Sequence, residues 1–367
     1  MSNKVDLTGR IRREAERLGF YKVGVAPAGP LPGVERFDSW LESGKQGQMR
    51  YMERQAAKRR DAGLVLDQAR SILVLARNYH TGDALTGDPL CGKISRYAWG
   101  EDYHGILSKG LESLEEFVRR EVPGARTLSY VDTGPVMEKV WGATTALGWM
   151  GKHTNLITLE RGSWFFIGII LLDAELEYDP VSRDHCGTCT SCISACPTGA
   201  IVSPYIVDAR LCISYLTIEL RGKIPRALRP LIGNRIYGCD DCQEVCPWNR
   251  FAVRTEEHCF HPLDQNHNPA LAPLLSITKE EFASRFRGSP IRRAGRDGFV
   301  RNVVVALGNS GHPAATAPLA QALGDASPLV RAHAVWAMAR LDSTEARSHL
   351  ESARLKEADP EVLEEFD

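Results

Sequence analysis

The organisation of this chain is decided by its cysteines, which begin at "CGTCTSCISACPTG" (Cys186–Gly199) and return at "CDDCQEVCPWN" (Cys239–Asn249). The first stretch has the complete pattern C-x2-C-x2-C-x3-C-P. The second has the same ending, with Ile236 where a fourth cysteine would stand. In such runs three thiolates bind one four-iron cluster and the fourth binds the neighbouring cluster. The spacing therefore predicts two [4Fe–4S] clusters.

The second cluster lacks one ligand in its own run, and Cys91, Cys212 or Cys259 could supply it. We assign Cys212, because it lies between the two runs and needs the least rearrangement of the chain. A pair of zinc sites is the alternative, which the spacing and the proline after each terminal cysteine disfavour. Cys91 and Cys259 are then ordinary thiols. The predicted ligands are Cys186, Cys189, Cys192 and Cys246 for the first cluster, and Cys196, Cys212, Cys239 and Cys242 for the second.

Composition indicates an ordinary globular protein, with 43% hydrophobic and 25% charged residues and a net charge of −1. No overall basic field indicates a nucleic-acid partner, so any such partner needs local patches. The first twenty residues are too charged for a signal peptide, and the longest apolar run, Trp164–Leu172, suits a buried strand. Ten cysteines then favour metal or redox work. We expect a cytoplasmic monomer without membrane contact.

Residues 1–178 have the pattern of an α/β domain. Strand-like runs, "YKVGVAP" from Tyr21, "SILVLARN" from Ser71, "NLITL" from Asn155 and "WFFIGIILL" from Trp164, accompany helical patterns such as Ile11, Ala15 and Leu18. A polar, glycine-rich stretch lies at 131–155, and α/β folds bind ligands at turns of this kind. A plain connecting loop is the alternative.

The rest of the chain divides into three parts: a ferredoxin-like domain at 179–258, a basic linker at 259–296, and a helical tail at 297–367. The tail repeats at a period of thirty residues, since "FVRNVVVALGN" at Phe299 aligns with "LVRAHAVWAMA" at Leu329. This is the pattern of HEAT-like repeats. Two such units cannot bury a core alone, so we expect the tail to pack on the body of the protein.

Two runs of basic residues flank the cysteines, one from Leu220 to Arg235 and one from Arg285 to Asn302. The first contains no acidic residue and the second contains one, Asp297. Such patches bind phosphate backbones, although a solvated face is the alternative. The residues predicted to contact nucleic acid are Arg221, Lys223, Arg292, Arg293 and Arg296.

The reaction centre is not signalled by a general cofactor motif. No G-x-G-x-x-G follows a predicted strand, so a dinucleotide fold is not indicated. A D-x-H-x-x-G motif is also absent, because Leu107 stands where the glycine after Asp102 and His104 would be. A cobalamin with a histidine lower ligand from that motif is therefore not expected.

Several segments together resemble the epoxyqueuosine reductase family, over nearly the whole chain. They are "ISRYAWGEDYH" at Ile94, "VDTGP" at Val131, "GWMGKHTNLI" at Gly148, the first cysteine run, "RLCISYLTIEL" at Arg210, "NRIYGCDDCQEVCPWN" at Asn234 and "RNVVVALGN" at Arg301. Ferredoxin runs occur in many proteins, whereas this combination with a HEAT-like tail is highly specific. The related reductive dehalogenases would be expected to carry an export signal and to lack the tail.

The resemblance implies an enzyme that reduces epoxyqueuosine at the wobble position of tRNA, of the GUN anticodon type, to queuosine. It implies cobalamin in the N-terminal domain without a protein lower ligand. An unidentified donor would send electrons through the distal and then the proximal cluster to cobalt. The alternatives are a reductive dehalogenase and a non-catalytic two-cluster protein that transfers electrons or binds RNA.

The resemblance also implies roles for individual residues. Asp132 of "VDTGP" matches the proton donor, which would need a pKa raised by burial; a turn-capping aspartate is the alternative. The stretch "GPVMEKVWG" varies within the family, so the substrate side is open, and Tyr103 and His104 receive no role. The residues implied to contact cobalamin are Arg59, Ser95, Arg96, Asp132, Lys152, Asn155, Leu156 and Ser214.

Overall fold

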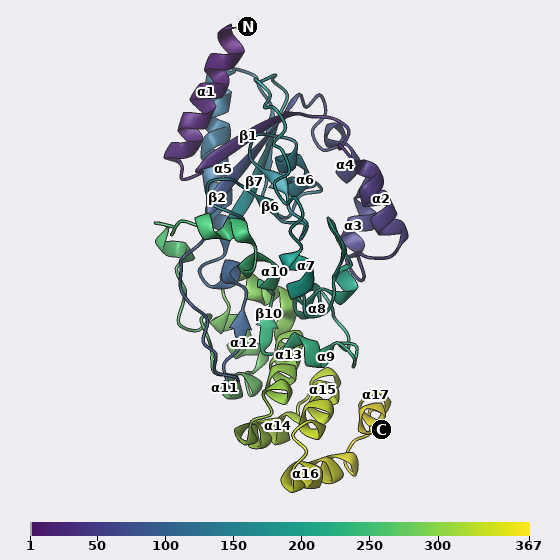
Figure 1. The fold of residues 1–367 in the computed structure, drawn as a ribbon. Helices are drawn as coiled ribbons and strands as arrows, with labels where there is room; N and C mark the ends of the chain where they lie inside the picture. The colour runs from purple at the N-terminus through teal and green to yellow at the C-terminus, as the bar shows by residue number, and fades with distance from the viewer. Residues whose placement is uncertain (1) are drawn as a thin grey trace.

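The computed structural model describes residues 2–367 as an elongated molecule. In Figure 1 a sheet with its helices lies at one end, the cysteine-rich segments lie in the middle, and the helical tail with the C-terminus lies at the other end. None of the helices within residues 2–367 combines the length and the apolar character needed to cross a lipid bilayer.

The N-terminal part is built on a four-stranded sheet with the order β1-β2-β7-β4. All three neighbouring pairs in this sheet are antiparallel, so the α/β class expected for this part is corrected to α+β. Strand direction depends on the connections between strands, which local hydrophobic patterns do not report. The strands are β1 (Lys22–Pro27), β2 (Ser71–Asn78), β4 (Thr127–Tyr130) and β7 (Phe165–Leu172).

Both faces of the sheet are covered. Leu73 and Leu75 of β2 face a core shared with α1 (Ser2–Arg17) and α5 (Tyr103–Glu121). The alternating residues Ile72 and Val74 face a second core that contains Trp141 of α6 (Glu138–Ala143). Burial on both faces explains why β2 and β7 are almost continuously apolar. The other elements of this part are α2 (Val34–Glu42), α3 (Arg50–Arg54), α4 (Ala56–Arg60), β5 (Trp149–Met150) and β6 (Leu156–Ile157).

A third core, here called the large core, combines segments that the sequence assigned to separate parts. β3 (Lys93–Ile94) pairs in parallel with β10 (Arg235–Tyr237), so a segment of the N-terminal part joins the cysteine-rich part. Residues of 259–296, among them Phe286, are buried in the same core. The expected linker therefore packs as part of the body. The helices of the segment 259–296 are α11 (Ala272–Leu275) and α12 (Lys279–Arg285). Besides β10, the elements of the cysteine-rich part are α7 (Ser191–Ala195), β8 (Ile201–Ser203), β9 (Ile206–Val207), α8 (Ile213–Ile218), α9 (Arg229–Ile232) and α10 (Asp241–Glu244).

The tail forms the two predicted helix pairs and packs on the body as expected. α13 and α15 lie one repeat apart and contact each other, while α13 also contacts β10, α8 and α9. The guanidinium group of Arg229 in α9 donates to Glu365 near the C-terminus through two hydrogen bonds of 2.7 and 2.6 Å. The tail helices are α13 (Gly295–Ser310), α14 (Thr316–Ala322), α15 (Pro328–Ala339), α16 (Thr344–Arg354) and α17 (Pro360–Leu363).

The ion pair between Arg229 and Glu365 is almost fully buried, with 2% and 8% of the two side chains exposed. We expect Arg229→Met to lower the stability of the docked tail by about 3–5 kcal/mol, because it leaves a buried carboxylate without its partner. Melting temperature is the measurement. The matched control is Arg347→Met, since Arg347 pairs with Asp342 at the exposed surface. Equal melting temperatures for the two variants would contradict a stabilising role for the buried pair.

Candidate functional site

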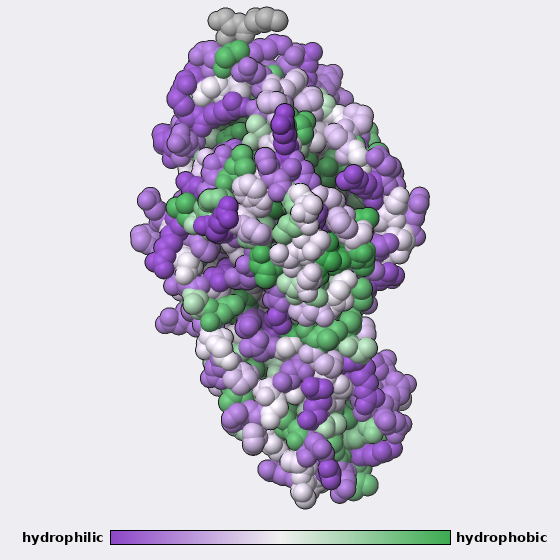
Figure 2. All heavy atoms as spheres, in the orientation of Figure 1, coloured by the Kyte–Doolittle hydropathy of each residue, from purple (hydrophilic) through white to green (hydrophobic). Residues whose placement is uncertain are grey.

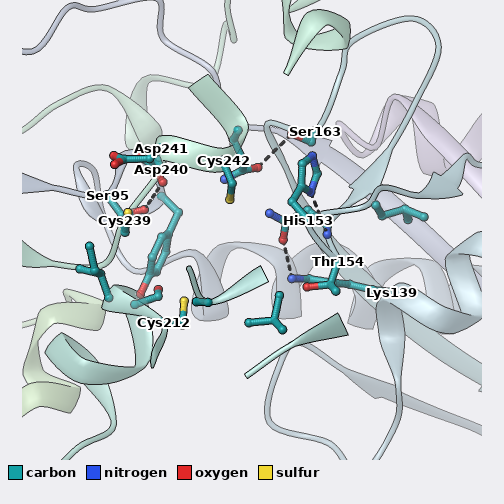
Figure 3. A pocket seen from close by; sticks show the side chains of 18 of the residues that line it. Ser95, Lys139, His153, Thr154, Ser163, Cys212, Cys239, Asp240, Asp241 and Cys242 are labelled. Carbon is teal, nitrogen blue, oxygen red and sulfur yellow. Dashed lines mark hydrogen bonds between the residues drawn. The ribbon is translucent and has the colours of Figure 1, made fainter. Parts of the chain in front are cut away.

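A cavity of about 450 Å³ lies between the sheet domain and the cysteine-rich segments. The loop after β4 brings Asp132 to it, and α6 adds Glu138 and Lys139. Four cysteines line it as well, and Figure 3 shows three of them, Cys212, Cys239 and Cys242, with Lys139 and His153 coming from other segments. A carboxylate and a group of thiols that are far apart in sequence thus line the same cavity.

The four thiols predicted for the first cluster lie together. Burial raises the pKa of Cys192, and the neighbouring thiols of Cys186, Cys246 and Cys189 raise it further. Cys246 and Cys186 pack in one apolar cluster with Trp149 and Trp248. Cys246 comes from the second run but lies beside the three cysteines of the first run. This arrangement agrees with the predicted exchange of ligands between the two runs.

The four thiols predicted for the second cluster form a separate group at the cavity. Burial raises the pKa of Cys242 well above its usual value, and the thiols of Cys239 and Cys212 add to that effect. Cys196 also raises the pKa of Cys212. Cys212 therefore lies where the second run lacks a cysteine. Ile236, at the position of the missing ligand, is buried in the large core instead.

The two remaining cysteines have other neighbours. The thiol of Cys91 lies 3.8 Å from Asp88, and that of Cys259 lies 4.0 Å from Glu257. Within residues 2–367 no three His, Cys, Asp or Glu side chains converge as the ligands of one metal ion do. A four-iron cluster makes a different demand, because its four thiolates surround the cluster and do not meet at one point. Two separate groups of four thiols fit two such clusters.

Asp132 stands in a strained backbone position with its side chain 61% exposed at the cavity. Its φ of 59° lies in the left-handed region, which aspartate and asparagine tolerate better than most residues. The hydroxyl of Tyr103 donates to Asp132 Oδ2 at 3.2 Å, and His104 Nε2 lies 3.7 Å from the same oxygen. The backbone N–H of Asp132 donates to Glu138 Oε1 at 2.7 Å.

A chain of ionisable groups leads away from Asp132. His104 Nδ1 lies 2.6 Å from Asp102 Oδ1, so the imidazole stands between two carboxylates. Burial lowers the pKa of His104, but the bonds to Asp102 and Asp132 raise it overall to about 9. His104 is therefore protonated at neutral pH and can hold a proton next to Asp132.

The pKa of Asp132 differs from the expectation. The interaction with His104 lowers it below its usual value, and this outweighs the partial desolvation of Asp132 by the cavity walls, whereas a raised pKa was expected from the sequence. The carboxyl group with a raised pKa is instead that of Glu138, since burial and the charge of Asp132 raise its pKa to about 8. At neutral pH these shifts favour the protonated forms of His104 and Glu138 and the ionised form of Asp132.

Sequence reasoning missed Lys139 and Glu138 and left His153 without a primary role. Lys139 Nζ donates to Asn155 Oδ1 at 2.7 Å, and burial lowers its pKa while Asp132 raises it. His153 Nδ1 accepts a hydrogen bond from the N–H of Asn155, and burial lowers its pKa to about 4, so the ring is neutral. The only signal for these residues was their place in the glycine-rich stretch 131–155.

Of the residues implied to contact cobalamin, five line the cavity and three do not. Arg59 donates to the carbonyl of Gly134, next to the Asp132 loop, at 3.2 Å. The Arg96 guanidinium donates to Glu244 and to the carbonyl of Asp83 instead. Lys152 donates to the carbonyls of Gly187 and Cys189 and so holds the loop of the first cysteine run. The residues that line the cavity are Ser95, Asp132, Asn155, Leu156 and Ser214.

The cavity has groups that fit an extended cofactor. The buried His153 Nε2 has no partner within residues 2–367 and can donate, since Nδ1 already accepts. Apolar side chains such as Phe165 and Leu156 supply flat surface, and Ser214 follows the cluster ligand Cys212 by two residues. This mixture of apolar wall and few polar groups is typical of cofactor sites.

The predicted nucleic-acid contacts are mostly engaged within the protein. Arg296 donates to Asp325 through two hydrogen bonds, and Arg293 pairs with Glu219. Lys223 lies 3.3 Å from Glu364 of the tail. Arg292 and Arg221 line an open hollow of about 620 Å³ beside the start of α13. Arg301 of the same basic run is fully buried, so this part of the run is structural.

Three sequence families match this chain. The epoxyqueuosine reductase QueG family matches residues 59–133, the 4Fe-4S double cluster binding domain matches residues 185–249, and HEAT repeats match residues 296–366.

Proteins similar to this chain are named consistently. Epoxyqueuosine reductase of Pseudomonas aeruginosa is 42% identical over 348 residues, which are 92% of this chain and 95% of that protein. The Escherichia coli protein of the same name is 38% identical over 347 residues, covering 93% of this chain and 92% of that one.

Solved structures show the same fold. A crystal structure of epoxyqueuosine reductase with an epoxyqueuosine-modified tRNA-Tyr stem loop is 32% identical, with a TM-score of 0.91, and covers 98% of this chain and 96% of that one. The Bacillus subtilis enzyme, in a structure whose catalytic aspartate loop is swung out of the active site, is 30% identical, with a TM-score of 0.90, and covers 98% of this chain and 97% of that one.

The grouping of thiols predicts the metal content. Anaerobically reconstituted protein should contain about eight iron atoms per chain, and Cys212→Ala should contain about four, because one cluster loses a ligand. Cys91→Ala and Cys259→Ala are the matched controls and should keep about eight. Iron analysis with electron paramagnetic resonance is the measurement. Loss of iron in Cys259→Ala, or about four atoms in the unmodified protein, would refute the assignment.

Proposed function

Since the chain belongs to the epoxyqueuosine reductase family, we propose that this oxidoreductase reduces the epoxide of epoxyqueuosine at the wobble position of a GUN-type tRNA to give queuosine. One observation carries the proposal beyond the family: a single cavity has Asp132 on one wall and the thiols of the second cluster on another. Electrons and a proton can therefore reach the same bound epoxide.

Two [4Fe–4S] clusters, held by the two groups of thiols, would carry single electrons, and cobalamin bound in the cavity would supply cobalt as the reductant of the epoxide. Ser95, Asn155, Leu156 and Ser214 are the residues that would contact the corrin from the cavity wall. Arg59 and Lys152 would act by holding the Asp132 loop and the first cysteine loop. We propose no contact from the side chain of Arg96, which pairs with Glu244.

The proton supply follows from the balance of the reaction. Reducing an epoxide takes two electrons and two protons, whether the product keeps the oxygen as a hydroxyl or loses it as water. Asp132 reaches the cavity, and its carboxylate can relay a proton from His104 to the opening oxygen. His104 Nε2 lies 3.7 Å from that carboxylate, and Asp102 holds the imidazole in place. The first transfer leaves His104 neutral, so the second proton has to be taken up from solvent. The pair explains how an aspartate with a lowered pKa can still act as an acid.

The tRNA would approach the open side of the cavity and extend over the basic surface. Arg292 and Arg221 are the best candidates for phosphate contacts, because they line an open hollow and form no ion pair within residues 2–367, although Arg221 also donates to the carbonyl of Ala294. We propose that Arg293, Arg296 and Lys223 act indirectly, by holding the segments that carry this surface.

The functional division remains the one the sequence suggests. We propose a cobalamin-binding part at 1–178, a two-cluster part at 179–258, a connecting part at 259–296 and helical repeats at 297–367. The merged core means that these parts are functional units that fold together. A reductive dehalogenase and a non-catalytic two-cluster protein are disfavoured by the family assignment and by the acid–base chain at the cavity, respectively.

Asp132→Asn tests the proton donor. Asparagine keeps the shape and tolerates the left-handed backbone, but it cannot give up a proton. We expect both clusters, cobalamin binding and tRNA binding to survive, and product to form at least about a hundredfold more slowly. The measurement is single turnover of pre-reduced enzyme with modified tRNA, followed by nucleoside mass spectrometry.

The pH profile of the same assay tests the proton supply. The pKa of His104 is raised to about 9, so the unmodified enzyme should hold its rate at neutral pH and lose it as the pH rises through about 9. His104→Gln should be slower and lack this step. A near-normal rate for Asp132→Asn with intact cofactors would assign the proton to a water molecule or to His153.

Arg292→Ala tests the tRNA surface. Loss of one phosphate contact should weaken tRNA binding and reduce the salt dependence by about one unit of slope. Arg13→Ala is the matched control, since this exposed arginine belongs to α1 at the far end of the molecule (Figure 1). The same slope in both variants would make Arg292 an ordinary solvated residue.

A further inference from the structure

In the proposed function, electrons from outside reach the first cluster group before the second, because the second borders the cavity that would hold cobalamin. Of the eight thiols assigned to clusters, Cys189 alone is exposed, so the first group comes closest to solvent at this residue. The loop around it, residues 183–191, is exposed almost throughout. The surface near Cys189 is therefore where a donor can approach.

Three arginines belong to the chain segments beside this surface: Arg161, Arg183 and Arg250. Arg183 precedes the ligand Cys186 by three residues, and Arg250 follows the ligand Cys246 by four, so each backbone lies within about 15 Å of a ligand. Arg161 precedes Gly162, which packs directly against Trp248 and Asn249. None of the three forms an ion pair with a carboxylate within residues 2–367, and the guanidinium group of Arg161 lies over the ring of Tyr21 at 4.5 Å.

The acidic residues of the same segments are already engaged. Glu160 pairs with Lys22, and Glu244 pairs with Arg96. Asp184 accepts hydrogen bonds from the N–H of Cys186 and the hydroxyl of Tyr205. Asp184 keeps its negative charge, because both of its partners are neutral, so the three arginines leave this surface with an excess of positive charge on a chain whose net charge is −1.

Exposed apolar side chains accompany these charges. Phe251 is 40% exposed, lies under Arg250 at 4.6 Å, and its ring is 5.9 Å from that of Trp248. Trp248 in turn packs with Cys186 and Cys246. Val181 and Val245 are also exposed. On the face drawn in Figure 2, hydrophobic residues form several small groups among polar ones. A few exposed apolar side chains, such as Phe251, Val181 and Val245, suit brief encounters more than a permanent interface.

We propose that the surface formed by Arg161, Arg183, Arg250, Val181, Val245 and Phe251, here called the entry face, docks an acidic one-electron carrier protein. The proposal rests on the proposed function. In each encounter the carrier loses one electron and the first cluster gains it, with no bond made or broken, so two encounters supply one epoxide reduction. Opposite charge steers the encounter, and the few apolar side chains hold it briefly.

The test measures reduction of the reconstituted holoenzyme by stopped flow, using a reduced acidic plant-type [2Fe–2S] ferredoxin as the probe. Arg161→Glu with Arg250→Glu should lower the second-order rate constant by about tenfold or more at low salt. The unmodified rate should fall with added salt, and the variant should lose that dependence. Reduction by dithionite, a small reductant, should be unchanged in both proteins.

Two further variants keep the test decisive. Arg183→Glu lies in an exposed loop and should reproduce the effect with full iron content, even if the double variant loses iron. Arg340→Glu carries the same charge change at the exposed end of α15, in the tail, and should have no effect. Equal ferredoxin rates for the unmodified protein and Arg183→Glu, or a rate independent of salt, would overturn the proposal. Failure of the proposed function would appear separately, as normal cluster reduction without formation of queuosine.

Discussion

The second group of thiols depends on two side chains of the tail, Arg301 and Asn302. The guanidinium group of Arg301 is fully buried and donates to the carbonyls of Leu216, Leu220 and Gly222 at the end of α8. A cation is favourable at this end of a helix, because the carbonyls there lack partners within the helix. Burial lowers the pKa of Arg301 to about 9, so it stays charged at neutral pH.

These two residues connect the tail with both cysteine segments of the second cluster group. Cys212 is the residue that precedes α8, so fixing the end of α8 also fixes that thiol. Asn302 donates to the carbonyls of Thr217 and Ile236, and Ile236 belongs to β10, which leads to Cys239. The tail is therefore part of the scaffold of the cluster, in addition to any surface that it offers to tRNA. This explains why two repeats suffice where an independent solenoid needs more.

What the sequence could predict depends on how local the constraint is. Thiolate ligands must be close in space and often in sequence, so the two groups of four were predictable from spacing, with Cys212 added by proximity. Packing of the tail followed from the burial that two repeats cannot provide alone. Strand direction was not predictable, because β1, β2 and β7 have the same apolar pattern whichever way they run. Arg301 looked like part of a basic surface, since composition does not distinguish a buried cation from an exposed one.

The pKa values at the site could likewise not be predicted from the local sequence. Asp132 was found through the family resemblance, but its pKa depends on His104, which reaches it from α5 across the sheet domain. Burial of a lone carboxyl raises its pKa, and this was the case expected for Asp132 from the sequence. With the imidazolium of His104 nearby, the ionised form of Asp132 is favoured, and the proton resides on His104. After each transfer, His104 can reprotonate Asp132. A lone buried carboxyl could regain its proton only from water, and that water would have to enter a cavity that the cofactor and substrate would fill. The lowered pKa of Asp132 is therefore compatible with acid catalysis, provided that His104 holds the proton between transfers.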